Sequence, residues 1–191
     1  AWRDGYLKEI ARVGRLTQDR PLTSIYFGGG TPSLMPPETT AAILDAAQRT
    51  WRFVNDVEIT LEANPTSIEA AQLKNFKLAG VNRISIGIQA LNDVDLRRLG
   101  RMHSARDAIS ALELTANTFD RYSFDLIYAR QYQTLEDWEA ELNQALSFGS
   151  DHLSMYQLTV EDGTVFGERH RRGQLGGLPD DDLGADFYEL T

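Results

Sequence analysis

The sequence predicts an α/β fold in which a parallel sheet curls into a barrel or part of one. Its hydrophobic periodicity switches repeatedly between helical spacing and short apolar strands. The five expected strands start roughly 25 to 40 residues apart, which is the size of a βα unit. Several strands read as apolar on both faces at their centres, as buried parallel strands do. An open doubly wound sheet is the structural alternative.

The first half of the chain predicts three helices and two strands. Trp2, Tyr6, Ile10 and Val13 recur at helical spacing within residues 1–16. After them we expect a strand at 24–27, a helix at about 38–51 behind Pro36-Pro37, a strand at about 57–62 that Asn64-Pro65 stops, and a helix from Thr66 or Ser67 to about 78 that Gly80 ends.

The second half continues the alternation, with polar residues that favour helix starts. We expect a strand at about 83–88, a short helix from Asn92 to about 99, a helix from Ser104 to about 117, a strand at about 121–128, a helix from Thr134 to about 148 with Gly149 at its end, and a strand at about 151–158. The final segment, DDLGADFYELT, resembles a helix that is cut off, and the first helix begins abruptly without Met. We therefore expect a fragment, or a chain missing its true beginning.

Composition indicates one globular domain and excludes several classes. The 191 residues carry a net charge of -9, which disfavours a nucleic-acid partner. There are no cysteines, which favours a cytoplasmic setting, and no apolar run approaches a membrane span. The basic run Arg169–Arg172 is typical of a solvated surface, although it could also hold the carboxylates of an anionic ligand.

Polar side chains follow the strands where a barrel places its ligand, at the carboxyl ends. Singly, each is more typical of a cap or a structural hydrogen bond. The set is more informative, because we expect its members to converge on one mouth. Its members are Gly28–Pro32, Glu62, Gln89, Asp125, Tyr128, Tyr156, Gln157 and Thr159.

Three consecutive glycines, Gly28, Gly29 and Gly30, follow the first strand. A tight turn before Pro32 explains one or two of them. The third favours close approach of a ligand to bare backbone. The glycines open no helix and no Lys follows, so the segment is not a phosphate-binding P-loop. Backbone carbonyls would suit a cationic amine instead.

Four segments in order, FGGGTPSLM, LEANP, RISIGIQ and SFDLIYA, resemble the radical S-adenosylmethionine family of oxygen-independent coproporphyrinogen III oxidase. The resemblance runs from about Ser24 to the end. The segment YQLTVEDGTVF is more similar to the HemW-type haem chaperone branch. The resemblance implies a partial (β/α)6 TIM-like barrel of parallel strands that lacks its first strand. It implies a single core-barrel domain over residues 1–191, truncated at both ends, with the family's C-terminal domain absent.

The family binds S-adenosylmethionine over a 4Fe-4S cluster, and the resemblance carries seven cofactor-binding positions onto this chain. It implies that the glycine segment holds the methionyl ammonium and that Arg101 pairs with the methionyl carboxylate. It gives no catalytic residue in this chain. The seven positions are Gly29, Gly30, Thr31, Glu62, Gln89, Arg101 and Asp125.

Two departures from the family pattern affect these expectations. The family holds its cluster with CxxxCxxC, but this chain has no cysteine, and His103, His152 and His170 lack ligand spacing. The resemblance places the cluster cysteines upstream of Ala1, so we expect no metal ligands here and no activity from this chain alone. The segment YARQYQT also stands where many relatives read Gly-Leu-Pro after the Tyr.

The resemblance implies a protein of haem metabolism, and it leaves open whether the protein is an enzyme. The first hypothesis is a chaperone that binds haem and delivers it to respiratory proteins. The alternative is the oxidase, which decarboxylates porphyrinogen propionates through a 5′-deoxyadenosyl radical. A weaker third hypothesis, a phosphate-binding barrel enzyme, predicts a basic group near the glycines, and none is found there.

Overall fold

The structure is a computed structural model that describes residues 2–150 and 152–191 as alternating strands and helices. All five expected strands and all seven expected helices are present, with ends that move by a few residues. The elements are α1 (Trp2–Gly14), β1 (Leu22–Phe27), the 3-10 helix η1 (Pro32–Leu34), α2 (Pro37–Thr50), β2 (Phe53–Ala63), α3 (Ser67–Leu78), β3 (Arg83–Gln89), α4 (Asp93–Arg98), α5 (Ala105–Ala116), β4 (Arg121–Tyr128), α6 (Leu135–Leu146), β5 (Leu153–Gln157), α7 (Val165–Arg171) and α8 (Asp181–Leu190).

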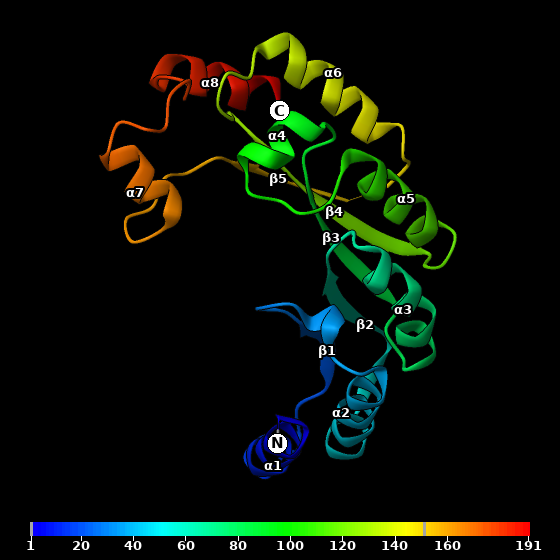
Figure 1. Cartoon of the computed structure of the whole chain (residues 1–191). Helices are drawn as coiled ribbons and strands as arrows, with labels where there is room; N and C mark the ends of the chain where they lie inside the picture. The colour runs from blue at the N-terminus through cyan, green and yellow to red at the C-terminus, as the bar shows by residue number, and fades with distance from the viewer. Residues whose placement is uncertain (1, 151) are drawn as a thin grey trace.

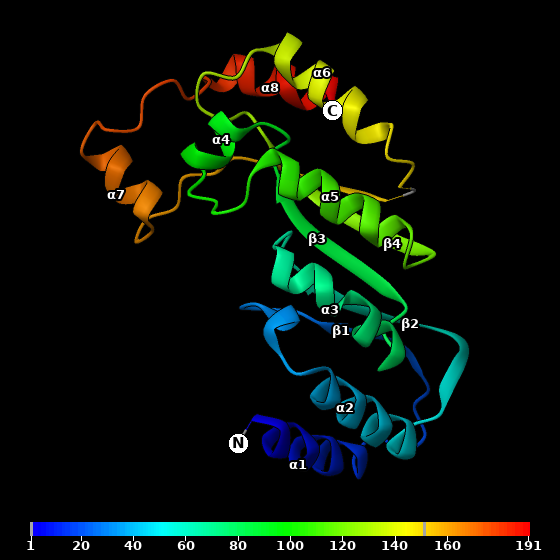
Figure 2. The same cartoon turned by 45° about the vertical axis from the view of Figure 1, so that its right-hand side comes forward.

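The strands form one parallel sheet in the order β1-β2-β3-β4-β5. The helices α2, α3, α5 and α6 follow one another along its convex side, and the sheet curls into an arc (Figure 1). Figure 2 shows the two chain ends at opposite ends of this arc. A doubly wound sheet reverses its strand order and has helices on both faces. Sequential order with helices outside therefore confirms a partial barrel.

Side-chain caps fix where three of the helices begin. Asn92 accepts a hydrogen bond from the Asp95 N–H at the start of α4. Ser104 with Asp107, and Thr134 with Asp137, form complete capping boxes before α5 and α6. Each cap satisfies backbone N–H groups that the helix leaves free, which stabilises the fold by about 1 kcal/mol.

The hydrophobic core lies between the sheet and its helices. Alternate residues of the central strands are fully buried there, with Ile84, Ile88 and Phe124 at 0% exposure. Phe76 from α3 and Trp138 from α6 are equally buried on the helix side. The core anchors each strand, so the strand ends are held in fixed relative positions.

The other face of β3 and β4 is polar, so the expectation that strand centres are apolar on both faces is wrong. The parallel register aligns Ser85 with Glu62 on one side and with Ser123 on the other. Ser123 donates a hydrogen bond to Ser85 over 3.2 Å and accepts one from Arg83 over 2.8 Å. The apolar, buried face of these strands is the one that the helices cover, whereas the concave face borders cavities.

Two elements were not predicted, η1 and α7. The basic run Arg169–Arg172 lies on and just after α7, where Glu168 pairs with Arg171 and Arg172. This ion pairing favours the solvated-surface interpretation of the run. Among the described residues, no helix is both long and apolar enough to span a bilayer.

Candidate functional site

Six of the seven predicted cofactor-binding residues line one cavity of about 250 Å³ at the carboxyl ends of the strands. They are Gly30, Thr31, Glu62, Gln89, Arg101 and Asp125. The seventh, Gly29, is joined to this group through a hydrogen bond to Glu62. Residues far apart in sequence therefore meet where a barrel places its ligand.

The three glycines are needed for two different reasons. Gly29 and Gly30 have φ of +83° and +60°, in the left-handed region that favours glycine. A Cβ at Gly28 would lie 2.8 Å from the ring of Tyr26 and 3.3 Å from Glu62. Turn geometry and close packing thus account for all three glycines, and their backbone still borders the cavity.

Glu62 holds this glycine turn against the sheet. Its Oε2 accepts a hydrogen bond from the Gly29 N–H over 3.1 Å, and its Oε1 accepts one from the Tyr26 hydroxyl over 2.9 Å. Burial and this hydrogen bond raise the pKa of Tyr26 to about 12. The carboxylate is therefore a fixed negative group on the cavity wall.

Replacing Glu62 by glutamine should lower the pKa of Tyr26 from about 12 toward 10, because the negative acceptor is lost. A pH titration of ¹³C-labelled tyrosine rings by NMR measures this change. The pKa of Tyr128 is raised chiefly by burial and should stay constant. An unchanged Tyr26 pKa would contradict the assigned contact.

The raised pKa of Tyr26 also makes the stability of the fold depend on pH. The fold favours the neutral hydroxyl, so the stabilising contribution of Tyr26 is present below pH 10 and is lost as the pH rises to about 12.

Asp125 and Arg101 line the same cavity with opposite charge. Burial raises the pKa of Asp125, while a hydrogen bond with Ser154 and the charge of Arg101 oppose that rise. Burial lowers the pKa of Arg101, and the charge of Asp125 opposes it. The site thus presents carboxylate acceptors and one guanidinium donor, which suits a zwitterionic ligand with hydroxyl groups.

Gln89 leaves β3 in an uncommon backbone conformation, with φ of +74° and a register shift against β4. It is 8% exposed. Its amide nitrogen, Nε2, lies close to Gly87, because a Cβ added to Gly87 would be 3.0 Å from that nitrogen. Gly87 therefore leaves the space that the Gln89 side chain occupies beside the cavity.

Other strand-end residues do not reach this cavity. Tyr128 is buried and packs on Trp138, with ring centroids 5.6 Å apart. Tyr156 lines a neighbouring cavity, whereas Gln157 borders a separate pocket beside α8. Thr159 follows β5 in an exposed position. The expectation that all strand-end residues converge on one mouth is therefore wrong for Tyr128, Tyr156, Gln157 and Thr159.

The neighbouring cavity, of about 320 Å³, shares Glu62, Ser85 and Asp125 with the first. Glu58 lies on its wall and pairs with Arg83 at 3.8 Å and with Arg121 at 3.5 Å. Sequence reasoning missed these lining residues. The signal was present as strand parity, because Arg83, Ser85 and Gly87 alternate with buried isoleucines.

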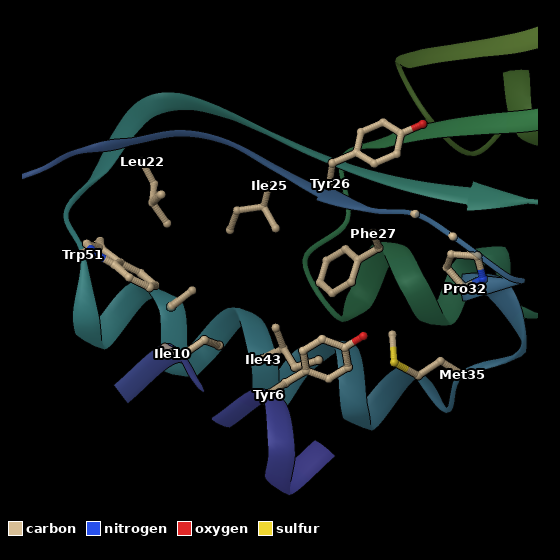
Figure 3. A pocket seen from close by; sticks show the side chains of 13 residues that line it. Tyr6, Ile10, Leu22, Ile25, Tyr26, Phe27, Pro32, Met35, Ile43 and Trp51 are labelled. Atoms are coloured by element: carbon tan, nitrogen blue, oxygen red, sulfur yellow. The ribbon is translucent and has the colours of Figure 1, made fainter. Parts of the chain in front are cut away.

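A third cavity, of about 330 Å³, lies on the helix side of β1. Figure 3 shows Tyr6, Ile43, Met35 and Trp51 around it, while Tyr26 projects from the opposite side of the strand. No charged residue lines it. This space is apolar and does not suit the polar ligand that the strand ends favour.

The residues present do not fit an iron–sulfur cluster. The chain has no cysteine, and no three His, Asp or Glu residues of the described chain are grouped as metal ligands would be. His103 instead contacts the carbonyl of Ile88 over 3.1 Å, and burial lowers its pKa.

Known proteins resemble this chain in sequence and in structure. The family model of the Radical SAM superfamily matches residues 2–145. Radical S-adenosyl methionine domain-containing protein 1, mitochondrial, of Mus musculus is 43% identical over 188 residues, covering 98% of this chain and 42% of the relative. Heme chaperone HemW of Haemophilus influenzae is 43% identical over 182 residues, covering 95% and 46%. HemW of Escherichia coli is 40% identical over 173 residues, covering 90% and 44%.

Among solved structures, coproporphyrinogen III oxidase HemN of Escherichia coli superposes with a TM-score of 0.81 at 24% identity, covering 97% of this chain and 43% of that one. This likeness bears on the fold alone. The chain spans less than half the length of the curated relatives named above.

Proposed function

This chain belongs to the Radical SAM superfamily, and from that premise we propose that its strand-end cavity binds S-adenosylmethionine. We further propose that the chain is the core barrel of a haem-chaperone-type protein. That protein would bind haem and deliver it to respiratory proteins. Three relatives that carry the chaperone name are 38 to 43% identical over most of the chain, which supports this branch.

The observation that carries the proposal is the meeting of six predicted residues at one cavity. The chemistry of this set suits S-adenosylmethionine. The carbonyls of the glycine turn and the Thr31 hydroxyl can accept from the ammonium, and Arg101 can donate to the carboxylate. Glu62 and Asp125 can accept from the ribose hydroxyls.

The chain has no cysteine and its described residues contain no group of His, Asp and Glu that could hold the superfamily's iron–sulfur cluster, so we derive no chemical step through it. The oxidase alternative has only the fold likeness to HemN in its support. Decarboxylation of coproporphyrinogen by the whole protein would favour that alternative. The cytoplasmic location remains a prediction, and several relatives carry the word mitochondrial in their names.

Replacing Arg101 by methionine should weaken S-adenosylmethionine binding about tenfold or more, because a hydrogen bond to a charged group contributes about 1.5 to 3 kcal/mol. Calorimetric titration of the chain measures the affinity. The matched control is Arg97→Met, which removes the same charge from an exposed position of α4. Equal affinities for the two variants would contradict the role of Arg101. A wild-type chain that shows no binding would contradict the proposed function itself.

A further inference from the structure

Strained backbone is concentrated behind the candidate site. Within residues 2–150 and 152–191, positive φ outside glycine occurs at Gln89 (74°), Ala129 (57°) and Tyr132 (60°). Gln89 is the last residue of β3, and Ala129 and Tyr132 follow β4, at the end of the sheet that carries the cavity. Such conformations persist only where the surroundings hold them, and they cluster at functional sites.

A buried ion network joins α4, the segment that follows β4, and α6. The Arg130 side chain is 3% exposed, that of Glu141 is 7% exposed and that of Asp95 is 11% exposed. Arg130 Nη2 lies 3.0 Å from Asp95 Oδ2 and also pairs with Glu141 Oε2. Buried charges lose hydration, and apolar replacements are often as stable. Stability alone therefore gives little reason for this network.

The network forms hydrogen bonds with the backbone at Gln89 and at Leu91. Arg130 Nη1 donates to the carbonyls of Ile127, over 2.8 Å, and of Gln89, over 3.4 Å. Glu141 Oε1 accepts a hydrogen bond from the Leu91 N–H. Both sides of Ala90 are thus held, by Arg130 from the segment after β4 and by Glu141 from α6, so this backbone cannot relax toward ordinary strand geometry without breaking a buried contact.

We propose that Arg130 is a positioning residue for the cofactor cavity. By fixing the Gln89 carbonyl, it holds the positive φ that directs the Gln89 side chain over Gly87 and along the cavity wall. This inference rests on the proposed binding of S-adenosylmethionine. Arg130 does not itself line the cavity, so it acts through Gln89.

The test is a double-mutant cycle on the chain. The variant Arg130→Met/Glu141→Gln removes one charge of each sign and leaves an amide oxygen for the Leu91 N–H. We expect it to weaken S-adenosylmethionine binding about tenfold, as the loss of one well-placed hydrogen bond does. In a Gln89→Ala background it should have less than about a twofold further effect, because groups that act through one another are not additive. Equal weakening in both backgrounds, or none in either, would overturn the proposal.

The control is Arg98→Met. Arg98 also pairs with Asp95, at 3.1 Å, and donates to the Gln131 carbonyl, and its hydrogen bonds and ion pairs within the described residues do not include Gln89. Its affinity should stay within about twofold of the wild type, since it lacks the contact that positions Gln89. If the Arg130 double variant does not fold, Arg130→Lys retains a buried positive charge and enters the same cycle.

A second readout needs no ligand and separates this inference from the proposed function. The Cα and Cβ chemical shifts of Gln89 report its backbone conformation. They should leave left-handed values in the Arg130 variant and keep them in Arg98→Met. Unchanged Gln89 shifts in a folded Arg130 variant would refute the positioning role even if the wild-type chain binds nothing.

Discussion

Replacing Gly30 by valine should abolish detectable binding of S-adenosylmethionine. Gly30 borders the cavity with φ of +60°, and no described atom outside residues 29–31 lies within 4 Å of the place where its Cβ would stand. The added side chain therefore occupies space that the ligand needs rather than space that the fold needs. Calorimetric titration measures the loss, and circular dichroism reports whether the fold is retained.

Gly149→Val is the matched control for this change. Gly149 has φ of +71° and the same open surroundings, but it lies between α6 and β5, away from the cavity. Both valines incur a backbone strain of about 1 to 3 kcal/mol. Loss of affinity in both variants would assign the effect to strain, and full affinity in Gly30→Val would show that the ligand binds elsewhere.

The second large effect concerns stability. Replacing Trp138 by alanine should lower the free energy of unfolding by about 3 to 5 kcal/mol, because the indole is completely buried. Its ring packs on Tyr128, and its Nε1 donates to the Thr191 hydroxyl over 2.9 Å. Trp138 also anchors α6, which carries Glu141. Urea unfolding followed by circular dichroism gives the change.

Trp2→Ala serves as the comparison, since Trp2 is 83% exposed on α1. Its replacement should change stability by no more than about 0.5 kcal/mol. Similar losses for the two tryptophans would contradict the described core, because they differ chiefly in burial.

Local signals made most of the fold predictable from sequence. A helix start can be predicted where a polar side chain can cap it, and the structure contains the predicted caps at Asn92, Ser104 and Thr134. The helix α7 was missed although Thr164 caps it in the same way, by accepting from the Gly167 N–H. It is only seven residues long, so hydrophobic periodicity gave it little support.

Residues that line the cavity could be predicted from the sequence, whereas the contacts that hold them in place could not. Glu62, Gln89 and Asp125 could be chosen because parallel strands bring their carboxyl ends to one edge. The hydrogen bond from the Gly29 N–H to Glu62 could not be foreseen, because it depends on the exact φ of the turn. The contact of Arg130 with Gln89 was equally hidden, since it joins positions 41 residues apart through a buried side chain.

The central claim is that the strand-end cavity binds S-adenosylmethionine, and amide chemical-shift mapping of the ¹⁵N-labelled chain tests it most directly. Titration should shift the amides of Gly29, Gly30, Glu62, Gln89 and Asp125 along one saturable curve. Amides of α1 and α2 residues that line the cavity of Figure 3, such as those of Ile10 and Ile43, should remain in place. Shifts confined to α1 and α2, or no saturable shifts at all, would contradict the account.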